Sequence, residues 1–104
     1  MYKDPAPDKV KYYDNAYQIN IKLGDKMAAV FSLIEEISEL DDIEVHKKAV
    51  ARIKSVYKKA LKRRKYNALN KKLNRNYKKY LRGKQDKEKF VGFLKDLSFE
   101  YSLD

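Results

Sequence analysis

Positively charged side chains recur at three- and four-residue intervals in the second half of the chain. Lys71, Arg75 and Arg82, with the pair Lys78–Lys79 between them, fall on one side of a helix because successive residues are rotated by about 100°. A fixed row of cations binds phosphate groups by charge, and each contact releases condensed counterions. We predict phosphate contacts from nine residues: Lys58, Lys62, Arg63, Arg64, Lys71, Arg75, Lys78, Lys79 and Arg82.

A second basic series, Lys54, Lys58, Lys62 and Lys65, has the same helical spacing and is expected to line the preceding helix. The run Lys-Arg-Arg-Lys over residues 62–65 lies between the two series. A plain solvated helix face is the alternative interpretation of both. The four-residue run also matches a nuclear-localisation pattern, which is a further alternative interpretation.

The basic residues are concentrated in one segment. Residues 47–89 hold nineteen Lys and Arg and two acidic residues, whereas residues 1–46 carry a net charge of −5. Such a segment attracts a polyanion, of which nucleic acid is the commonest in the cytoplasm. We therefore expect a nucleic-acid partner and a cytoplasmic location. We expect no membrane partner, because the basic faces lack the large apolar residues that interfacial helices bury.

Two protein-binding hypotheses fit the charges as well. Residues 35–44 hold six acidic residues and no basic one, so they can meet other protein subunits or copies of the chain itself. The second hypothesis belongs to a different function class. In it, the chain is a small helical inhibitor or adaptor, of the kind that mobile elements encode. Its basic face masks an acidic or nucleic-acid-binding site on a protein partner.

Nine tyrosines are interleaved with the charges. Tyr66, Tyr77 and Tyr80 have the residue type that stacks on bases or bonds phosphates. At helical spacing, tyrosine is more often a core residue with its hydroxyl at the rim. We favour that interpretation for Tyr13, Tyr17, Tyr57 and Tyr77, and leave Tyr66 and Tyr80 open between the two.

Residue types that would support an enzyme are scarce. The chain has no Cys, and its single His46 has no Ser nearby in sequence, so a nucleophile–base pair is not expected. The acidic residues Asp41, Asp42 and Glu44 before His46 resemble metal ligands, but acids at a helix start are favoured by the helix dipole. No Gly-rich loop is present to hold a nucleotide. We predict no catalytic residue, no metal and no cofactor.

These residues must be positioned by helices, because apolar side chains recur at helical spacing along most of the chain. Asp8 is predicted to cap the first helix and Gly24 to end it, with residues 1–7 as a flexible arm. The alternation over residues 18–23 leaves a strand there as the alternative. Asp25 is predicted to cap a second helix. Its apolar side is expected to hold Met27, Val30, Phe31, Ile34 and Ile37.

The basic segment is predicted to form a third and a fourth helix. Asp42 is expected to cap the third, and the apolar side then rotates by about 100° after Leu61. This rotation predicts a break within residues 62–67, with Asn67 as a candidate cap; one bent helix over residues 43–82 is the alternative. The inward side of the fourth helix is expected to hold Leu69, Leu73, Tyr77, Tyr80 and Leu81.

Gly83 is expected to end the fourth helix and Asp86 to cap a fifth. The core side of the fifth helix carries Phe90, Leu94, Leu97 and Tyr101. Short turns between amphipathic helices predict an all-α fold, a small antiparallel bundle of four to five helices in one domain over residues 8–104.

Three segments give the chain a resemblance to a known family. They are Leu23-Gly-Asp-Lys-Met-Ala28 at a capped helix start, Tyr57-Lys-Lys-Ala60-Leu-Lys62 followed by two arginines, and the phenylalanine-rich stretch from Phe90 to Tyr101. In order and spacing they resemble the small helical subunit of type III-A CRISPR effector complexes. Ala28 stands where the family has arginine, and the family's basic C-terminal tail is missing.

The resemblance implies a non-catalytic bundle in an antiviral ribonucleoprotein. Copies would stack along the duplex of guide and target RNA and hold its backbone by charge, while neighbouring subunits cleave RNA. On this basis we favour RNA over DNA as the nucleic-acid partner.

Overall fold

The structure is a computed structural model that describes residues 7–103, and it contains five helices. They are α1 (Pro7–Leu23), α2 (Lys26–Glu39), α3 (Ile43–Ala60), α4 (Arg63–Leu81) and α5 (Lys87–Glu100). The all-α prediction is confirmed, and within residues 7–103 no strand is present. Residues 18–23, the alternative strand, belong to α1. Residues 1–6 of the expected arm lie outside the described residues, and Pro7 is helical.

Three aspartates cap helices as the sequence predicts. The Ala28 N–H donates to Asp25 Oδ1 at 3.0 Å, and the Lys89 N–H donates to Asp86 Oδ1 at 2.8 Å. Asp42 accepts from the backbone N–H groups of Glu44 and Val45. Each cap satisfies N–H groups that have no partner inside their own helix.

The two glycines at predicted helix ends have the left-handed backbone that favours glycine. Gly24 follows α1 with a φ of 77°, and Gly83 follows α4 with a φ of 74°. Asp8, in contrast, is not a cap but lies in the first turn of α1, because the helix already starts at Pro7. Proline is favoured in the first turn of a helix since its missing N–H would have no partner there.

The basic segment forms two helices rather than one bent helix. Leu61 and Lys62 have extended backbone, with ψ of 152° in both, and this interrupts the helical hydrogen bonding. Lys62 occupies the cap position of α4, so the prediction of Asn67 as a cap is wrong; Asn67 lies inside α4. The break therefore falls at the N-terminal edge of the predicted window, where no residue has capping chemistry.

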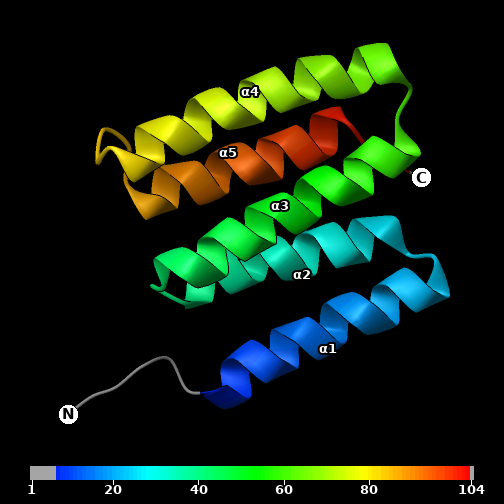
Figure 1. Cartoon of the computed structure of the whole chain (residues 1–104), viewed down its shortest axis with the longest axis horizontal. Coiled ribbons are helices and arrows are strands. Elements are labelled where there is room, and N and C mark those ends of the chain that lie inside the picture. Colours follow the sequence, from blue (N-terminus) through cyan, green and yellow to red (C-terminus); the bar gives the residue numbers. More distant parts are fainter. Residues whose placement is uncertain (1–6, 104) are drawn as a thin grey trace.

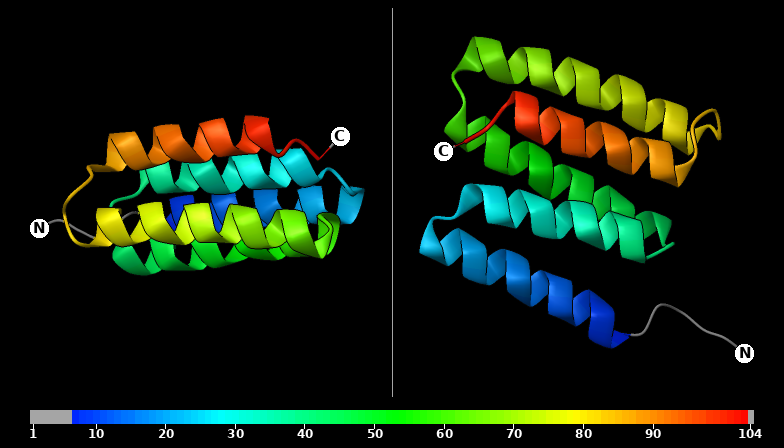
Figure 2. Two further views of the ribbon diagram at one scale, coloured as in Figure 1. Left: turned by 90° about the horizontal axis from the view of Figure 1, so that it is seen from above. Right: turned by 180° about the vertical axis from the view of Figure 1, so that it is seen from behind.

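Helices α2, α3, α4 and α5 form an antiparallel four-helix bundle, and α1 is added along its edge (Figures 1 and 2). Each bundle helix packs on its neighbour in sequence, and α5 closes the ring by packing on α2. Helix α1 packs on α2, and it is tied to α3 by an ion pair of 2.7 Å between Asp14 and Arg52. Helix α4 therefore lies at one side of the molecule and α1 at the other (Figure 1).

The core lies between the four bundle helices. Its fully buried side chains include Leu33 and Ile37 of α2, Ile53 of α3, Leu73 of α4 and Phe90 of α5. Two residues predicted for the core are exposed instead: Phe31 at 40% and Leu81 at 48%. Phe31 lies almost opposite Leu33 around α2, since two residues turn a helix by about 200°. Leu81 is the last residue of α4, and Tyr80 takes the inward position before it.

His46 is a fully buried polar side chain beside this core, at 1% exposed. Its Nε2 contacts the Leu40 carbonyl oxygen, which can only accept, so Nε2 carries the hydrogen. Nδ1 is then the acceptor for the Tyr80 hydroxyl at 2.9 Å. His46 thus joins the turn between α2 and α3 to the end of α4.

Candidate nucleic-acid interface

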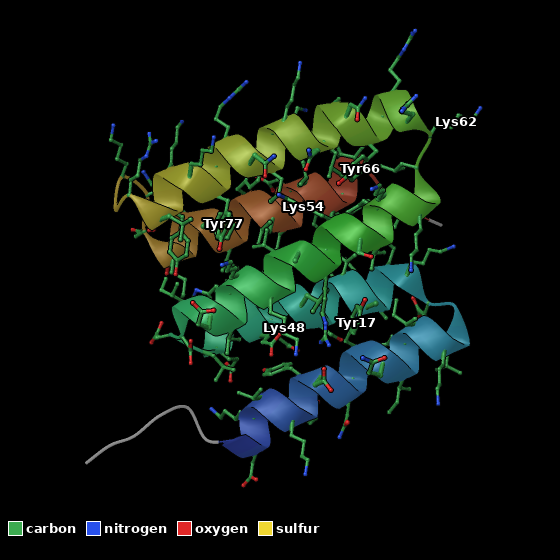
Figure 3. The ribbon with its side chains drawn as sticks, viewed as in Figure 1. Tyr17, Lys48, Lys54, Lys62, Tyr66 and Tyr77 are labelled. Atoms are coloured by element: carbon green, nitrogen blue, oxygen red, sulfur yellow. The ribbon has the colours of Figure 1, made fainter. Side chains whose placement is uncertain are left out.

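Helix α4 presents its cations along the outer edge of the bundle (Figure 3). Leu69 and Leu73 are fully buried and fix which side of α4 faces inward, toward α5 and α3. All nine residues predicted to contact phosphate are exposed, and eight of them lie on α4 or at its ends; Lys58 lies on α3.

Five of the nine predicted residues line one groove along the C-terminal half of α4. The groove has a volume of about 500 Å³, and no carboxylate is among its lining side chains. Asn74 and Lys84 also line it and were missed by the sequence analysis. Asn74 has the helical spacing of the basic row, three residues after Lys71, so periodicity offered a sign of it. Lys84 follows the Gly83 turn, where helical periodicity no longer applies. The predicted residues here are Lys71, Arg75, Lys78, Lys79 and Arg82.

Two more predicted residues, Lys58 and Arg63, line a smaller hollow of about 370 Å³ at the turn between α3 and α4. Lys62 and Arg64 are exposed beside it but line neither hollow. Arg63 and Lys78 are separated by roughly 22 Å along the helix, at about 1.5 Å per residue. The structure thus divides the predicted residues into two basic clusters at opposite ends of α4.

The cations of the two clusters are not neutralised within the described part of the chain. None of the nine predicted residues forms an ion pair with a described carboxylate. Their neighbour Lys72 differs, because its Nζ lies 2.7 Å from Glu100 Oε2 on α5. That hydrogen bond raises the pKa of Lys72.

The second basic series is only partly a surface row. Lys54 is half-buried between α3 and α4 (Figure 3), where its Nζ donates to Asn74 Oδ1. Burial lowers the pKa of Lys54. The prediction that Lys54 lines an open basic face is therefore wrong, because α3 is covered by α4 at this point. Lys65, assigned by sequence to the preceding helix, is in α4.

The N-terminus of α4 adds to the positive potential. Unlike α2, α3 and α5, it has no side-chain cap, and its first turn contains no acidic residue. Arg63 and Arg64 instead lie at the positive end of the helix dipole, which is an unfavourable place for a cation. An anion bound there would relieve this repulsion.

The tyrosines near the basic clusters face the core. The Tyr80 ring stacks on Phe90 with centroids 5.0 Å apart and an angle of 6° between the planes. Tyr77 stacks on the same phenylalanine at 5.7 Å, and Tyr66 also packs against the core. Tyr66 and Tyr80, which the sequence left open, are thus half-buried core residues, although Tyr66 also lines the smaller hollow.

The other tyrosines expected in the core are buried to different degrees. Tyr13 and Tyr57 are buried, whereas Tyr17 is half-buried beneath the guanidinium of Arg52, which lies 4.5 Å from its ring centroid. Burial raises the pKa of Tyr57 to about 12, and its hydroxyl has no hydrogen-bond partner among residues 7–103. These rings hold the helices together.

The acidic residues before His46 serve the helix start. Asp42 caps α3, and Glu44 lies in its first turn. Asp41 forms an ion pair of 2.5 Å with Lys87, and this contact lowers the pKa of the aspartate. Over residues 7–103, no group of three or more His, Asp and Glu side chains is placed to hold a metal ion.

Comparisons with protein-family models, with curated proteins and with solved structures gave no significant match. Among the helices described, none is both long and apolar enough to cross a membrane.

Proposed function

We propose that the chain is a non-catalytic nucleic-acid-binding subunit that holds an RNA backbone along α4. The observation that carries this proposal is the groove beside Arg75 and Arg82, which is lined by six cations and no carboxylate. The proposal includes other protein subunits or copies of the chain as partners. It also includes the CRISPR ribonucleoprotein that the sequence resemblance implies.

Unpaired cations at this density repel one another, and a polyanion removes the repulsion. Each phosphate that replaces small counterions also releases them, which favours binding most at low salt. The contacts are expected to be nearly independent of sequence, because lysine and arginine on this edge meet phosphates and the nearby tyrosine rings are used in the core.

Binding is best measured by fluorescence anisotropy with a labelled RNA of about 40 nucleotides, several times the length that one small domain covers. The test variant reverses three cations of the basic clusters, Arg63→Glu, Arg75→Glu and Arg82→Glu. A matched control makes the same change of net charge on α1 and α2, at exposed positions, with Lys11→Glu, Lys22→Glu and Lys26→Glu. Far-UV circular dichroism checks that both variants remain helical.

The proposal predicts that the test variant loses most of its RNA affinity while the control keeps more of it. Equal losses in both variants would mean that net charge alone attracts RNA, which would contradict a specific interface. Absence of binding to both RNA and DNA would also contradict the proposal and favour the adaptor hypothesis, in which the basic face meets a protein. Competition with DNA of the same length tests the preference for RNA.

A further inference from the structure

A groove with different chemistry runs along α2, on the side away from α4. Helices α1 and α5 both pack on α2 and flank it, and the side of α2 between them is left uncovered (Figure 2). The groove has a volume of about 540 Å³ and is lined from Ala28 to Glu39 of α2, with Asn20 of α1 and Lys95 of α5 at its margins. Its α2 side spans about three helical turns, or roughly 16 Å at 1.5 Å per residue.

Large apolar side chains are exposed on this face. Phe31 lines the groove, and its ring lies 6.3 Å from that of Phe99 on α5, which is 72% exposed. Both rings remain in contact with water in the folded chain, although exposure of an apolar ring to water is less favourable than its burial. Exposed apolar groups that cluster in this way are typical of a surface that another molecule covers.

Helix α1 extends the apolar surface. Tyr12, Ile19 and Leu23 are exposed, and their spacing of seven and four residues places them on one side of α1. Arg52 of α3 contacts α1 through Asp14 and lies over Tyr17, which fixes the opposite flank of the helix toward α3. The exposed side of α1 is therefore turned away from α3, as the groove is.

Two carboxylates line the groove. Glu35 and Glu39 lie one helical turn apart, with Lys95 of α5 at the margin. Lys9 of α1 forms an exposed ion pair of 3.7 Å with Glu39, whereas Glu35 has no ion pair with a described cation. Carboxylates in this position repel phosphate, so the groove does not extend the basic edge along α4. They would also face each other if two copies of the chain met through this same face, which disfavours a symmetric dimer there.

We propose that this groove binds a cationic amphipathic helix of a protein partner. Phe31 and Phe99 would cover the apolar side of that helix. Glu35 would meet one of its lysines or arginines, and Glu39 would meet another in exchange for its exposed pair with Lys9. A groove that runs parallel to one helix over three turns has the shape that helix-in-groove recognition uses. The proposal does not depend on nucleic-acid binding, because it rests on residues of α1, α2 and α5 alone.

The probe is a fluorescein-labelled peptide of leucine and lysine, with leucines at three- and four-residue spacing. A peptide of the same composition in scrambled order is its control. The full chain is titrated into each peptide at about 0.15 M salt, where long-range charge effects are screened beyond about 8 Å. The test variant carries Phe31→Ser and Phe99→Ser. The control variant, Leu81→Ser, removes an apolar side chain of similar exposure on α4.

We expect the amphipathic peptide to bind at least about tenfold more tightly than the scrambled one, and the test variant to lose about tenfold in affinity. Leu81→Ser should bind as the unmodified chain does. Glu35→Gln with Glu39→Gln should weaken binding and reduce its dependence on salt. These substitutions lie at exposed positions, so circular dichroism should remain helical for each.

Three results would overturn the proposal. One is equal affinity for the two peptides, which would show attraction by charge without a shaped site. Another is unchanged affinity in the Phe31→Ser, Phe99→Ser variant. The third is a concentration-dependent dimer in sedimentation analysis that this variant abolishes, because a second copy of the chain would then occupy the groove.

Discussion

Lys71 and Lys72 are neighbours in α4, but only the substitution of Lys71 by glutamine is expected to weaken nucleic-acid binding. Lys71 lines the large basic groove and has no carboxylate partner among the described residues. Lys72 lies 2.7 Å from Glu100 and 5.6 Å from the ring centroid of Tyr101, so its charge is already engaged within the protein. The two variants change net charge equally, and each therefore serves as the control for the other.

The size of the effect follows from the number of phosphate contacts. If five or six groove cations each meet a phosphate, the logarithm of the binding constant should fall with the logarithm of salt with a slope of about −3.5 to −5. Lys71→Gln removes one contact and should reduce the slope by about 0.7–0.9. Relative to about 1 M salt, this corresponds to a five- to eightfold loss of affinity at about 0.1 M. Lys72→Gln should leave the slope unchanged.

Anisotropy titrations with the same labelled RNA, repeated at salt concentrations from about 0.05 to 0.2 M, measure both slopes. Loss of the Lys72–Glu100 pair should have little influence on folding, because solvent screens an ion pair at the surface. Equal slopes for the two variants would refute the assignment of this groove as the nucleic-acid-binding surface. A larger loss for Lys72→Gln would refute it as well, and would place the nucleic acid on the side of α4 next to α5.

Three further predictions concern stability. Leu94→Ala should lower the free energy of unfolding by about 2–5 kcal/mol in urea denaturation, whereas Phe31→Ala should cost much less because its ring is exposed; equal costs would contradict the burial pattern. Tyr80→Phe should cost about 1–3 kcal/mol by the same assay, because it leaves His46 Nδ1 without its donor while the ring stack remains; no change would mean that this hydrogen bond adds nothing. Burial raises the pKa of Glu36, so its protonated form is favoured in the folded state. Protonation thus stabilises the fold at low pH, and this contribution is lost as pH rises through the raised value. The melting temperature of Glu36→Gln should therefore rise relative to that of the unmodified chain between about pH 4 and pH 7, and a difference independent of pH would contradict this.

Helix ends were predictable where one residue's own chemistry sets them. The caps at Asp25, Asp42 and Asp86 depend on a carboxylate that reaches an N–H group two or three residues ahead, which sequence spacing displays directly. The start of α4 was not predictable in this way. Lys62 has no capping side chain, and the extended backbone at Leu61 and Lys62 is maintained by the packing of α3 and α4 on the rest of the bundle.

That the cations of α4 face away from the core could be predicted from the rotation of about 100° between successive helical residues, since Leu73 and Arg75 point to different sides of any regular helix. Contacts between distant parts of the sequence could not. Lys54 is half-buried because Asn74, twenty residues later, lies across from it. His46 is buried because Tyr80 meets it across 34 residues. Phe31 has the same residue type as core residues. Its ring remains exposed because α1 and α5 pack on other sides of α2 and leave the side that carries Phe31 uncovered.

The way the four bundle helices follow one another also has a kinetic consequence. Three of the four contacts around the ring join helices that are consecutive in sequence, so they form between segments linked by short turns. Only the packing of α5 on α2 must bring together parts of the chain separated by two other helices. Proteins dominated by such local contacts fold in about microseconds to milliseconds. The chain is thus expected to fold rapidly. The docking of α5 on α2 is expected to have the largest loop-closure entropy cost, because it joins the segments that are farthest apart in sequence.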